Sequence, residues 1–250
     1  VCDRHFGVGA DGLIYILPSN EADFRMRMFN PDGSEAEMCG NGIRCAAKFA
    51  FENNLACANP VNVSTLAGIK NIVLKLDGEK VKAATVDMGK PRLERNEIPM
   101  VGDEGMVVSE PLMVGDKNIL VTCVSMGNPH CITFVDDVEN YPVCEIGQII
   151  ENHKSFPNRT NAEFVQVLNR QEIRMRVWER GAGETLACGT GACASAVAAV
   201  LNDLVERKIT VHLNGGDLEI EWSEPGNVFM TGPAVEVYTG ELSSEFLNNL

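Results

Sequence analysis

Hydrophobic and polar residues alternate along several short stretches of the chain, which is the pattern of half-buried β-strands. Residues 24–29 show it most clearly, with Phe24, Met26 and Met28 separated by arginines. Apolar runs bounded by Gly, Pro or Asn predict further strands, and Asp77-Gly78 and Asn214-Gly215 predict tight hairpin turns. The other expected strands lie at residues 13–17, 61–64, 72–76, 80–86, 119–125, 131–135, 163–168, 172–178, 209–213, 218–222, 228–231 and 234–238.

Two other stretches, residues 42–52 and 192–204, are rich in alanine and predict helices. A shorter helical pattern covers residues 143–153. Because the alanine-rich helices carry apolar residues on several faces, we expect other elements to surround them. The sequence therefore predicts an α+β fold in which strands wrap around each central helix.

The chain contains an internal duplication. Residues 24–48 align without a gap to residues 173–197, at an offset of 149 residues, and eight of the twenty-five pairs are identical. Both copies contain Cys-Gly-x-Gly immediately before the predicted helix, at Cys39 and at Cys188. Two copies indicate a duplicated domain, so we predict two pseudo-symmetric halves. The arginines of the repeated strands, among them Arg27 and Arg176, are interpreted as solvated strand faces.

A cysteine at a helix start has chemistry of its own. Unpaired backbone N–H groups and the helix dipole favour the thiolate and lower the thiol pKa. Two such helix starts that face each other also form a site for a carboxylate and for an enolate-like intermediate. One thiolate and one thiol on opposite sides of a bound molecule can remove a proton from one face and deliver a proton to the other. This arrangement inverts a stereocentre, in principle without a cofactor.

The amino-acid composition argues against several classes of protein function. The chain has 250 residues, a formal net charge of −14 and 45% hydrophobic residues. This acidic balance argues against nucleic acid and membrane partners, and no apolar run approaches the ~18 residues of a membrane span. Nine cysteines in no disulfide-framework spacing favour free thiols in a reducing compartment, so we expect a cytoplasmic protein. No paired metal half-sites occur, so no metal is expected.

Several motifs together resemble the diaminopimelate epimerase family. They are residues 38–45 (MCGNGIRC), 179–185 (ERGAGET), 187–191 (ACGTG), 127–130 (GNPH), 4–12 (RHFGVGADG) and 230–234 (MTGPA). The resemblance covers nearly the whole chain, in order. It implies a pyridoxal-phosphate-independent enzyme that interconverts LL- and meso-2,6-diaminopimelate in lysine and peptidoglycan precursor biosynthesis. It also implies a homodimer.

The resemblance implies roles for individual residues. Cys39 and Cys188 would be the acid–base pair. His130 and Glu179 would tune the two thiols. The residues expected to hold the substrate, through side chains or through backbone at the helix starts, are Asn30, Gly40, Asn41, Asn128, Asn161, Glu179, Arg180, Gly189 and Thr190.

The resemblance also implies the architecture. Each half would be a β-barrel-like sheet around a central helix, with the C-terminal segment returning to the first half. We therefore predict one domain at residues 1–89 with 233–250, carrying Cys39, and another at 90–232, carrying Cys188. The family begins with a strand bearing a Gly-Asn-Asp-Phe-like motif whose asparagine contacts substrate. This chain begins after it, so we expect an N-terminal truncation relative to the family.

Two alternatives remain open. Another cofactor-independent racemase of the same fold, of the histidine or proline type, would keep both cysteines. The proline type resembles Cys-Gly-His-Gly at the first cysteine, where this chain has Asn41. A non-catalytic protein that only binds an amino acid is the second alternative.

Overall fold

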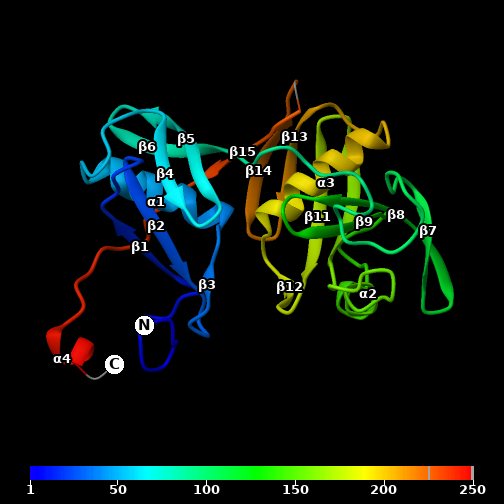
Figure 1. The fold of residues 1–250 in the computed structure, drawn as a ribbon, viewed down its shortest axis with the longest axis horizontal. Coiled ribbons are helices and arrows are strands. Elements are labelled where there is room, and N and C mark those ends of the chain that lie inside the picture. The colour runs from blue at the N-terminus through cyan, green and yellow to red at the C-terminus, as the bar shows by residue number, and fades with distance from the viewer. Residues whose placement is uncertain (225, 249–250) are drawn as a thin grey trace.

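The computed structural model describes residues 1–224 and 226–248. Within them fifteen strands form one continuous sheet that is divided into two halves lying side by side (Figure 1). The first half contains β1 (Leu13–Leu17), β2 (Phe24–Phe29), β3 (Glu35–Ala36), α1 (Gly40–Glu52), β4 (Val61–Thr65), β5 (Gly68–Asp77) and β6 (Lys80–Asp87). The second contains β7 (Glu110–Val114), β8 (Lys117–Ser125), β9 (Pro129–Phe134), α2 (Val143–Glu151), β10 (Asn161–Asn169), β11 (Glu172–Glu179), β12 (Gly183–Thr185), α3 (Gly189–Leu201), β13 (Lys208–Leu213), β14 (Gly216–Trp222) and β15 (Val228–Pro233), and α4 (Ser244–Asn248) follows.

The two halves repeat one strand pattern. In the first, β1 is antiparallel to β2, β2 is parallel to β4, and β4, β5 and β6 follow as antiparallel neighbours. In the second, β10, β11, β13, β14 and β15 show the same sequence of antiparallel, parallel and antiparallel pairings. The short strands β3 and β12 pair with β2 and β11 in the same way. The predicted pseudo-symmetric α+β fold is therefore confirmed, and β6 and β15 are equivalent elements.

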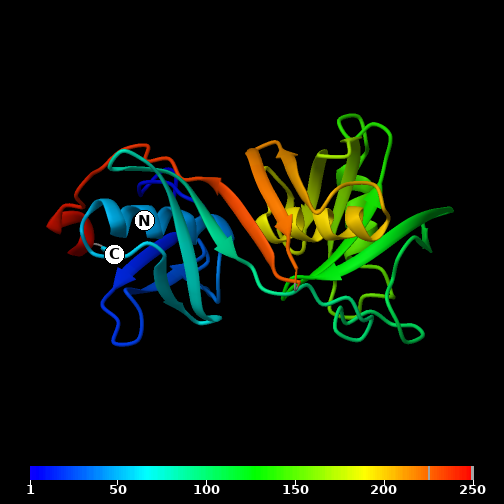
Figure 2. The same cartoon turned by 90° about the horizontal axis from the view of Figure 1, so that it is seen from above.

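These equivalent strands join the halves. β15 pairs antiparallel with β6 on one side and with β14 on the other, so the sheet passes from one half to the other without a break. In this joint Thr85 lies opposite Thr231, and their hydroxyl oxygens are 2.7 Å apart. Figure 2 shows the two strands crossing between the halves, with α1 on one side and α3 on the other.

The central helices differ in how completely they are covered. Every residue of α3 from Gly191 to Ala199 is buried, because strands β8 and β9 cover it in addition to the repeated strands. In contrast, α1 buries Ile43, Ala46, Ala47 and Ala50 but leaves Phe49 exposed. The expectation that both helices are surrounded is thus correct for α3 and only partly correct for α1.

The predicted strand at residues 234–238 is absent. The structure has no regular element between Pro233 and Ser244, and Val235 and Val237 are exposed. Alternation of apolar and polar residues produces a strand only where a neighbouring strand can pair with it. Ala234 instead lies beside Ile14 and Cys45, around a hollow of about 240 Å³ against the first half. The domain boundaries given above stay predictions.

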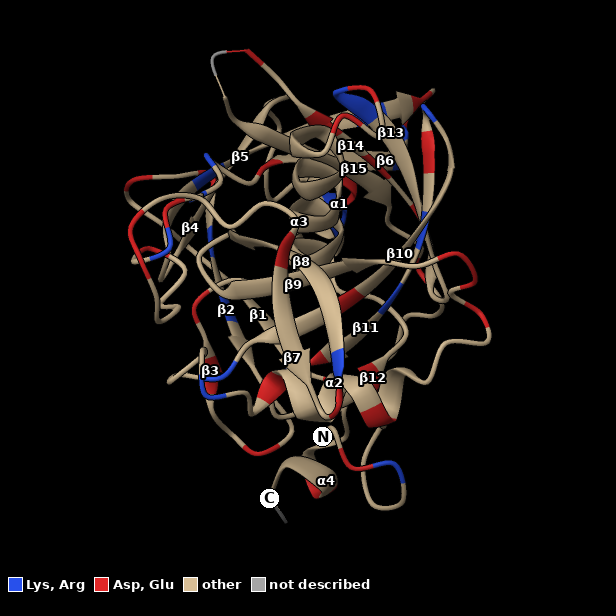
Figure 3. Ribbon diagram, turned by 90° about the vertical axis from the view of Figure 1, so that its right-hand side faces the viewer, with Lys and Arg blue, Asp and Glu red and all other residues tan. Residues whose placement is uncertain are grey.

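Charged side chains are spread over the molecule. In the view of Figure 3, lysine and arginine positions are interspersed with the more numerous acidic ones. Within the described residues, no helix is long and apolar enough to cross a membrane.

Candidate functional site

Both alanine-rich helices begin at a cysteine, as the duplication predicts. Cys39 is the N-cap of α1 and Cys188 is the N-cap of α3, with similar extended backbone angles (φ −133°, ψ 116° and φ −127°, ψ 111°). Each sulfur accepts a hydrogen bond from a first-turn backbone N–H, Cys39 Sγ from Gly42 and Cys188 Sγ from Gly191, both at 3.4 Å. The two thiols therefore take the place that a serine or aspartate oxygen commonly occupies at a helix start.

An ion pair braces the strand before each cysteine. Arg27 Nε lies 2.7 Å from Glu35 Oε1, and Arg176 Nε lies 2.7 Å from Glu184 Oε1. All four side chains are partly buried, so the interpretation as solvated strand faces is wrong for Arg27 and Arg176, whereas Arg25 of the same strand as Arg27 is exposed. Each pair links a long strand to the short strand that leads into the cysteine, β2 to β3 and β11 to β12. Repeated pairs of this kind hold both helix starts in the same local geometry.

Met230, on the joining strand β15, lies between the two helix starts. A methyl group built on Gly40 would come within 2.8 Å of Met230 Cε, and one built on Gly189 within 3.1 Å of its Sδ. The same position on Gly189 is 3.6 Å from Asn41 Oδ1, so the first turns of α1 and α3 adjoin. A side chain at either position would therefore meet Met230, which would have to move. The fold thus brings Gly40, Asn41 and Gly189 together.

Buried Arg44 of α1 strengthens this junction. Its Nη1 donates to the carbonyl oxygen of Gly40 at 3.0 Å, and its Nε donates to that of Pro233 at 3.4 Å. The guanidinium therefore ties the first turn of α1 to the end of β15. Burial lowers the pKa of Arg44.

A chain of hydrogen bonds reaches Cys188 from inside the second half. His130 Nδ1 is 2.6 Å from Glu163 Oε1, and His130 Nε2 is 3.1 Å from Asn128 Oδ1. Asn128 Nδ2 donates to Thr190 Oγ1 at 3.3 Å, and Thr190 Oγ1 is 3.5 Å from Cys188 Sγ. Three residues predicted for the site, Asn128, His130 and Thr190, are therefore connected to the cysteine.

The environment of Cys188 reverses one expectation. Cys188 is 6% exposed. Burial raises its pKa well above that of an ordinary thiol, and the negative charge of Glu179 raises it further. The hydrogen bonds from Thr190 and Gly191 lower the pKa, but by less. The predicted thiolate preference at a helix start is therefore wrong for Cys188, because desolvation and the nearby Glu179 carboxylate outweigh the helix N-terminus.

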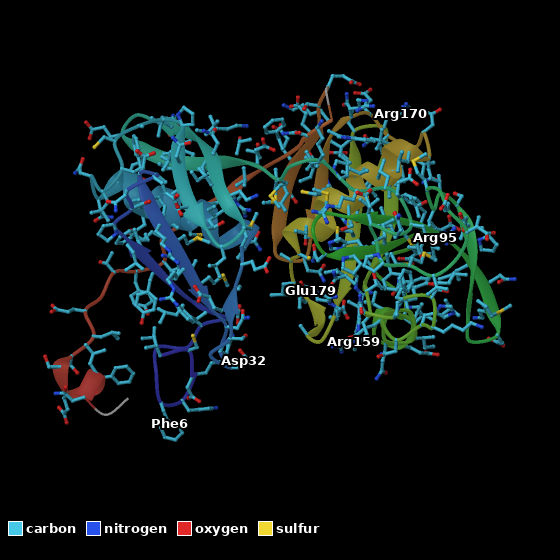
Figure 4. The ribbon with its side chains drawn as sticks, viewed as in Figure 1. Phe6, Asp32, Arg95, Arg159, Arg170 and Glu179 are labelled. Atoms are coloured by element: carbon cyan, nitrogen blue, oxygen red, sulfur yellow. The ribbon has the colours of Figure 1, made fainter. Side chains whose placement is uncertain are left out.

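Glu179 and Arg180 end β11 and enter the turn before β12. Glu179 Oε1 accepts a hydrogen bond from Thr185 Oγ1 at 2.5 Å, and Glu179 lies on the side of the second half that faces the first (Figure 4). Buried Asn161 fixes this turn, since its Oδ1 accepts from Arg180 N at 2.9 Å and its Nδ2 donates to Pro129 O at 2.9 Å. The Arg180 side chain is exposed and donates to Asn158 O at 3.0 Å.

Asn30 lies in the turn after β2. Its Nδ2 donates to Ser34 Oγ at 3.0 Å, within the same turn. Asp32, labelled in Figure 4, belongs to this turn and accepts from the Ser34 hydroxyl and backbone N–H. The structure thus places Asn30 in the first half, on the segment that leads to Cys39, without a direct bond to the chain of residues that ends on Cys188.

Some residues that build the site were not singled out by the sequence. Glu163 and Glu151 are both buried, and Glu163 lies in the mostly apolar strand β10. Glu151 Oε1 accepts from Gly181 N at 2.9 Å and its Oε2 accepts from Trp178 Nε1 at 2.7 Å, which anchors the turn carrying Arg180. A single carboxylate at an apolar position of a strand or helix was the available signal, because a buried charge requires specific partners.

A hollow of about 820 Å³ on the second half does not belong to this arrangement. Asn202, the C-cap of α3, lines it together with Ser109, Thr122 and Tyr141. It therefore lies at the opposite end of α3 from Cys188.

The family model described as diaminopimelate epimerase matches residues 1–94 and 122–237. A diaminopimelate epimerase of Moorella thermoacetica is 60% identical over 242 residues, which cover 96% of this chain and 87% of that protein. One of Pelotomaculum thermopropionicum is 58% identical over 241 residues, covering 96% and 86%.

Solved structures with the same fold are more distant in sequence. A probable proline racemase from Agrobacterium radiobacter matches with a TM-score of 0.70 at 13% identity, covering 94% of this chain and 77% of that chain. A PhzF-family phenazine biosynthesis protein from Bacillus anthracis matches with a TM-score of 0.67 at 20% identity, covering 92% and 84%. At these identities the likeness concerns the fold alone.

Proposed function

The chain belongs to the diaminopimelate epimerase family, and from that membership we propose that it interconverts LL- and meso-diaminopimelate with Cys39 and Cys188 as the two proton-transfer groups. The observation that carries this assignment is the pair of N-cap cysteines on equivalent helices whose first turns adjoin beside Met230. No other pair of cysteines among the described residues caps two equivalent helices.

The proposed reaction is a transfer of one proton at each face of the α-carbon. One cysteine, as thiolate, takes the α-proton and becomes a thiol, while the C–H electron pair stays on the substrate as a carbanion. The other cysteine, as thiol, protonates the opposite face and becomes a thiolate. The configuration is inverted, the number of protons on enzyme and substrate is conserved, and the two cysteines have exchanged roles. No cofactor enters this scheme.

Burial gives the two cysteines different starting roles. Cys188 holds its proton because burial and the charge of Glu179 raise its pKa. We therefore assign Cys188 as the proton donor of the resting enzyme and Cys39, which is half-exposed, as the base. In the reverse direction the roles are exchanged.

Backbone groups at the helix starts would hold the reacting carboxylate. The first-turn N–H groups at Gly40, Asn41, Gly189 and Thr190 have no partner within their helices, and the helix dipoles favour negative charge there. As the α-proton leaves, charge moves onto the carboxylate oxygens, so these donors stabilise the transition state more than the ground state.

Polar side chains would hold the remaining groups of the substrate. We propose Asn30, Asn128, Glu179 and Arg180 for its amino and carboxylate groups, and His130 and Glu179 for tuning the thiols. Asn161 is proposed for the same groups, and its amide also holds Pro129 and Arg180. It keeps in register the two segments that carry Asn128 and Glu179.

Replacement of each cysteine tests the assignment. We expect Cys39→Ala and Cys188→Ala each to lose ~10²–10⁴-fold in kcat, because each removes one proton-transfer group. Cys45→Ala, on the exposed face of α1, is the matched control and keeps wild-type turnover. The measurement is the interconversion of purified LL- and meso-diaminopimelate, together with solvent deuterium at the α-carbon. Wild-type turnover by either variant would exclude the two-cysteine scheme.

The same assay decides between the alternatives left open by the sequence. Turnover of histidine or proline, but not of diaminopimelate, would assign a different racemase. A binding protein would bind diaminopimelate without incorporating deuterium. The relatives at 58–60% identity favour the diaminopimelate substrate.

We further propose that the chain is a homodimer in the cytoplasm. The exposed Val235, Val237 and Tyr238 form an apolar segment suited to a subunit contact. All nine cysteines are free, which suits a reducing compartment. Light scattering on the purified protein should give twice the chain mass of 27.2 kDa, and the chain mass itself would contradict the dimer.

A further inference from the structure

Glu163 is a buried carboxyl group to which the scheme above gives no role. It lies on β10, fully buried in the second half. Its Oε1 is 2.6 Å from His130 Nδ1 on the neighbouring strand β9, and its Oε2 has no hydrogen-bond partner within the described residues. A buried polar atom without a hydrogen-bond partner destabilises the folded protein, so the presence of Glu163 at this position requires a specific explanation.

The first turn of α3 accommodates this carboxyl group. A methyl group on Gly191 would come within 2.8 Å of Glu163 Oε1, so the carboxyl occupies space beside the helix start that an alanine side chain would enter. The same glycine donates its N–H to Cys188 Sγ. Glu163 is therefore packed against the turn that holds the sulfur, while it contacts His130 directly.

The hydrogen bonds from His130 to Cys188 have a direction. In the orientation that the structure gives its amide, Asn128 Nδ2 donates to Thr190 Oγ1 and Asn128 Oδ1 faces His130 Nε2, and this orientation requires the imidazole proton to be on Nε2. Thr190, having accepted from Asn128, can donate its own hydroxyl hydrogen to Cys188 Sγ. Each group in this chain of hydrogen bonds then donates in the direction of the sulfur.

The reverse direction is chemically possible. If the imidazole proton were on Nδ1, His130 Nε2 would accept from Asn128 Nδ2. Asn128 Oδ1 would then accept from the Thr190 hydroxyl, and Cys188 Sγ would lose that donor. An amide and a hydroxyl permit both directions, so the group at His130 Nδ1 decides between them.

We propose that Glu163 is a positioning residue that keeps the His130 proton on Nε2 and so directs the Thr190 hydroxyl toward Cys188 Sγ. In this arrangement Glu163 is a neutral acid that carries its proton on Oε1 and donates it in a hydrogen bond to His130 Nδ1. The oxygen without a hydrogen-bond partner, Oε2, is then an uncharged carbonyl oxygen. The proposal rests on the role of Cys188 given above.

The surroundings of Glu163 support the neutral acid. Burial raises the pKa of Glu163, and the opposing effect of His130 is smaller. Glu179, Cys131 and Cys188 are the other titratable groups whose charges act on or are affected by it. When Cys188 becomes a thiolate, the hydroxyl of Thr190 is then already turned toward the new negative charge.

Two variants of similar size separate a directing hydrogen bond from simple packing. Glu163→Gln can still donate to His130 Nδ1 and should keep kcat within about threefold of wild type. Glu163→Met fills the space without a polar group and should lose ~10–100-fold in kcat with KM changed by less than about threefold, as for loss of a group that acts on the thiol and not on substrate binding. Equal loss in both variants, or wild-type kcat in Glu163→Met, overturns the proposal.

Two measurements read the hydrogen-bond chain without turnover. NMR of ¹⁵N-histidine-labelled protein, with the His130 signal assigned from a His130→Gln sample, should show a neutral ring protonated on Nε2 in wild type and Glu163→Gln. Alkylation of Cys188 followed by mass spectrometry should show its pH midpoint displaced upward in Glu163→Met only.

The wild-type NMR spectrum alone is sufficient to overturn the proposal if Glu163→Met does not fold. An Nδ1–H tautomer or a doubly protonated ring at neutral pH excludes Glu163 as the proposed donor. Because this spectrum requires no substrate, the proposal about Glu163 and the assignment of the reaction can fail separately.

Discussion

Cys39 and Cys188 occupy the same position on equivalent helices but lie in different surroundings. Both sulfurs accept a hydrogen bond at 3.4 Å from the third residue that follows them. Cys188 is buried beside Glu163 and Glu179, whereas Cys39 is half-exposed. The duplication therefore preserves the hydrogen bond to each sulfur while the surrounding charge and burial differ. In the proposed two-base reaction one group starts without its proton and the other with it, and burial favours the proton on Cys188.

The raised pKa of Cys188 predicts the pH dependence of its reactivity. A thiol reacts as its thiolate, so a raised pKa shifts alkylation of Cys188 to a pH above that of an ordinary thiol. We expect iodoacetamide labelling of Cys188, followed by mass spectrometry, to have a midpoint above ~8.5. Exposed Cys57 of the same sample serves as the internal comparison. A midpoint below that of Cys57 would contradict the protonated resting state.

At the scale of elements, α2 supports the turn that carries Glu179 and Arg180. Its Gly147 packs against Trp178 of β11, and a methyl group on Gly147 would come within 2.5 Å of the Trp178 Cβ. At the end of the same helix, Glu151 accepts the hydrogen bond from Trp178 Nε1. The close approach of α2 to β11 therefore depends on glycine at position 147, which has no side chain.

Gly147→Ala should destabilise the protein, although alanine normally favours a helix over glycine by up to ~1 kcal/mol. The added methyl group forces α2 away from β11 at a cost of ~1–3 kcal/mol, as overpacking does in a close-packed core. Gln148→Ala, at the exposed neighbouring position, is the matched control and should be close to neutral. Urea unfolding of the two variants measures the difference, and equal stability would show that the helix can shift freely.

The local sequence pattern was sufficient to predict those strands and turns that local interactions determine. Residues 24–29 were predicted with the bounds that β2 has, and the Asp77-Gly78 turn joins β5 to β6. Residues 234–238 failed because their alternation finds no neighbouring strand. The two- and three-residue strands β3 and β12 contain too few residues to show a period. They are defined by backbone pairing with a longer strand, which ion pairs such as Arg27–Glu35 accompany.

The candidate site also contains residues that the sequence predicts and residues that it does not. Cys39, Cys188 and the helix starts could be found from the repeat, because both copies retain the same motif. Glu163 and Glu151 are harder to identify, since their roles depend on partners far away in the sequence. The raised pKa of Cys188 was also out of reach, because burial is a property of the folded chain.

At the scale of the whole molecule, buried thiols couple stability to alkaline pH. Burial raises the pKa of Cys193, inside α3, to about 12 from an ordinary value of 9.0. Its native proton is therefore held more tightly than in the unfolded chain. This contribution to stability is complete below pH 9 and is lost as the pH rises toward 12, with a slope of up to ~1.4 kcal/mol per pH unit.

Cys193→Ala should reduce that loss. The variant is less stable at neutral pH by ~1 kcal/mol, because a buried sulfur is removed, but its free energy of unfolding should fall less steeply above pH 9. Cys57→Ala, at an exposed position, should follow the wild-type curve. The check is urea unfolding across pH 8–11, and parallel curves for Cys193→Ala and wild type would contradict the prediction.

The joint between β6 and β15 has a consequence for the origin of the molecule. These strands are the final strands of the two repeats, and they pair antiparallel with each other. Two identical copies of an ancestral half-length chain would meet edge to edge in the same manner about a twofold axis, each lending one thiol to a shared centre. In the present chain the two halves differ, so that one sulfur is enclosed and the other is accessible. On this view, a site shared between two identical chains would have preceded the site within one chain.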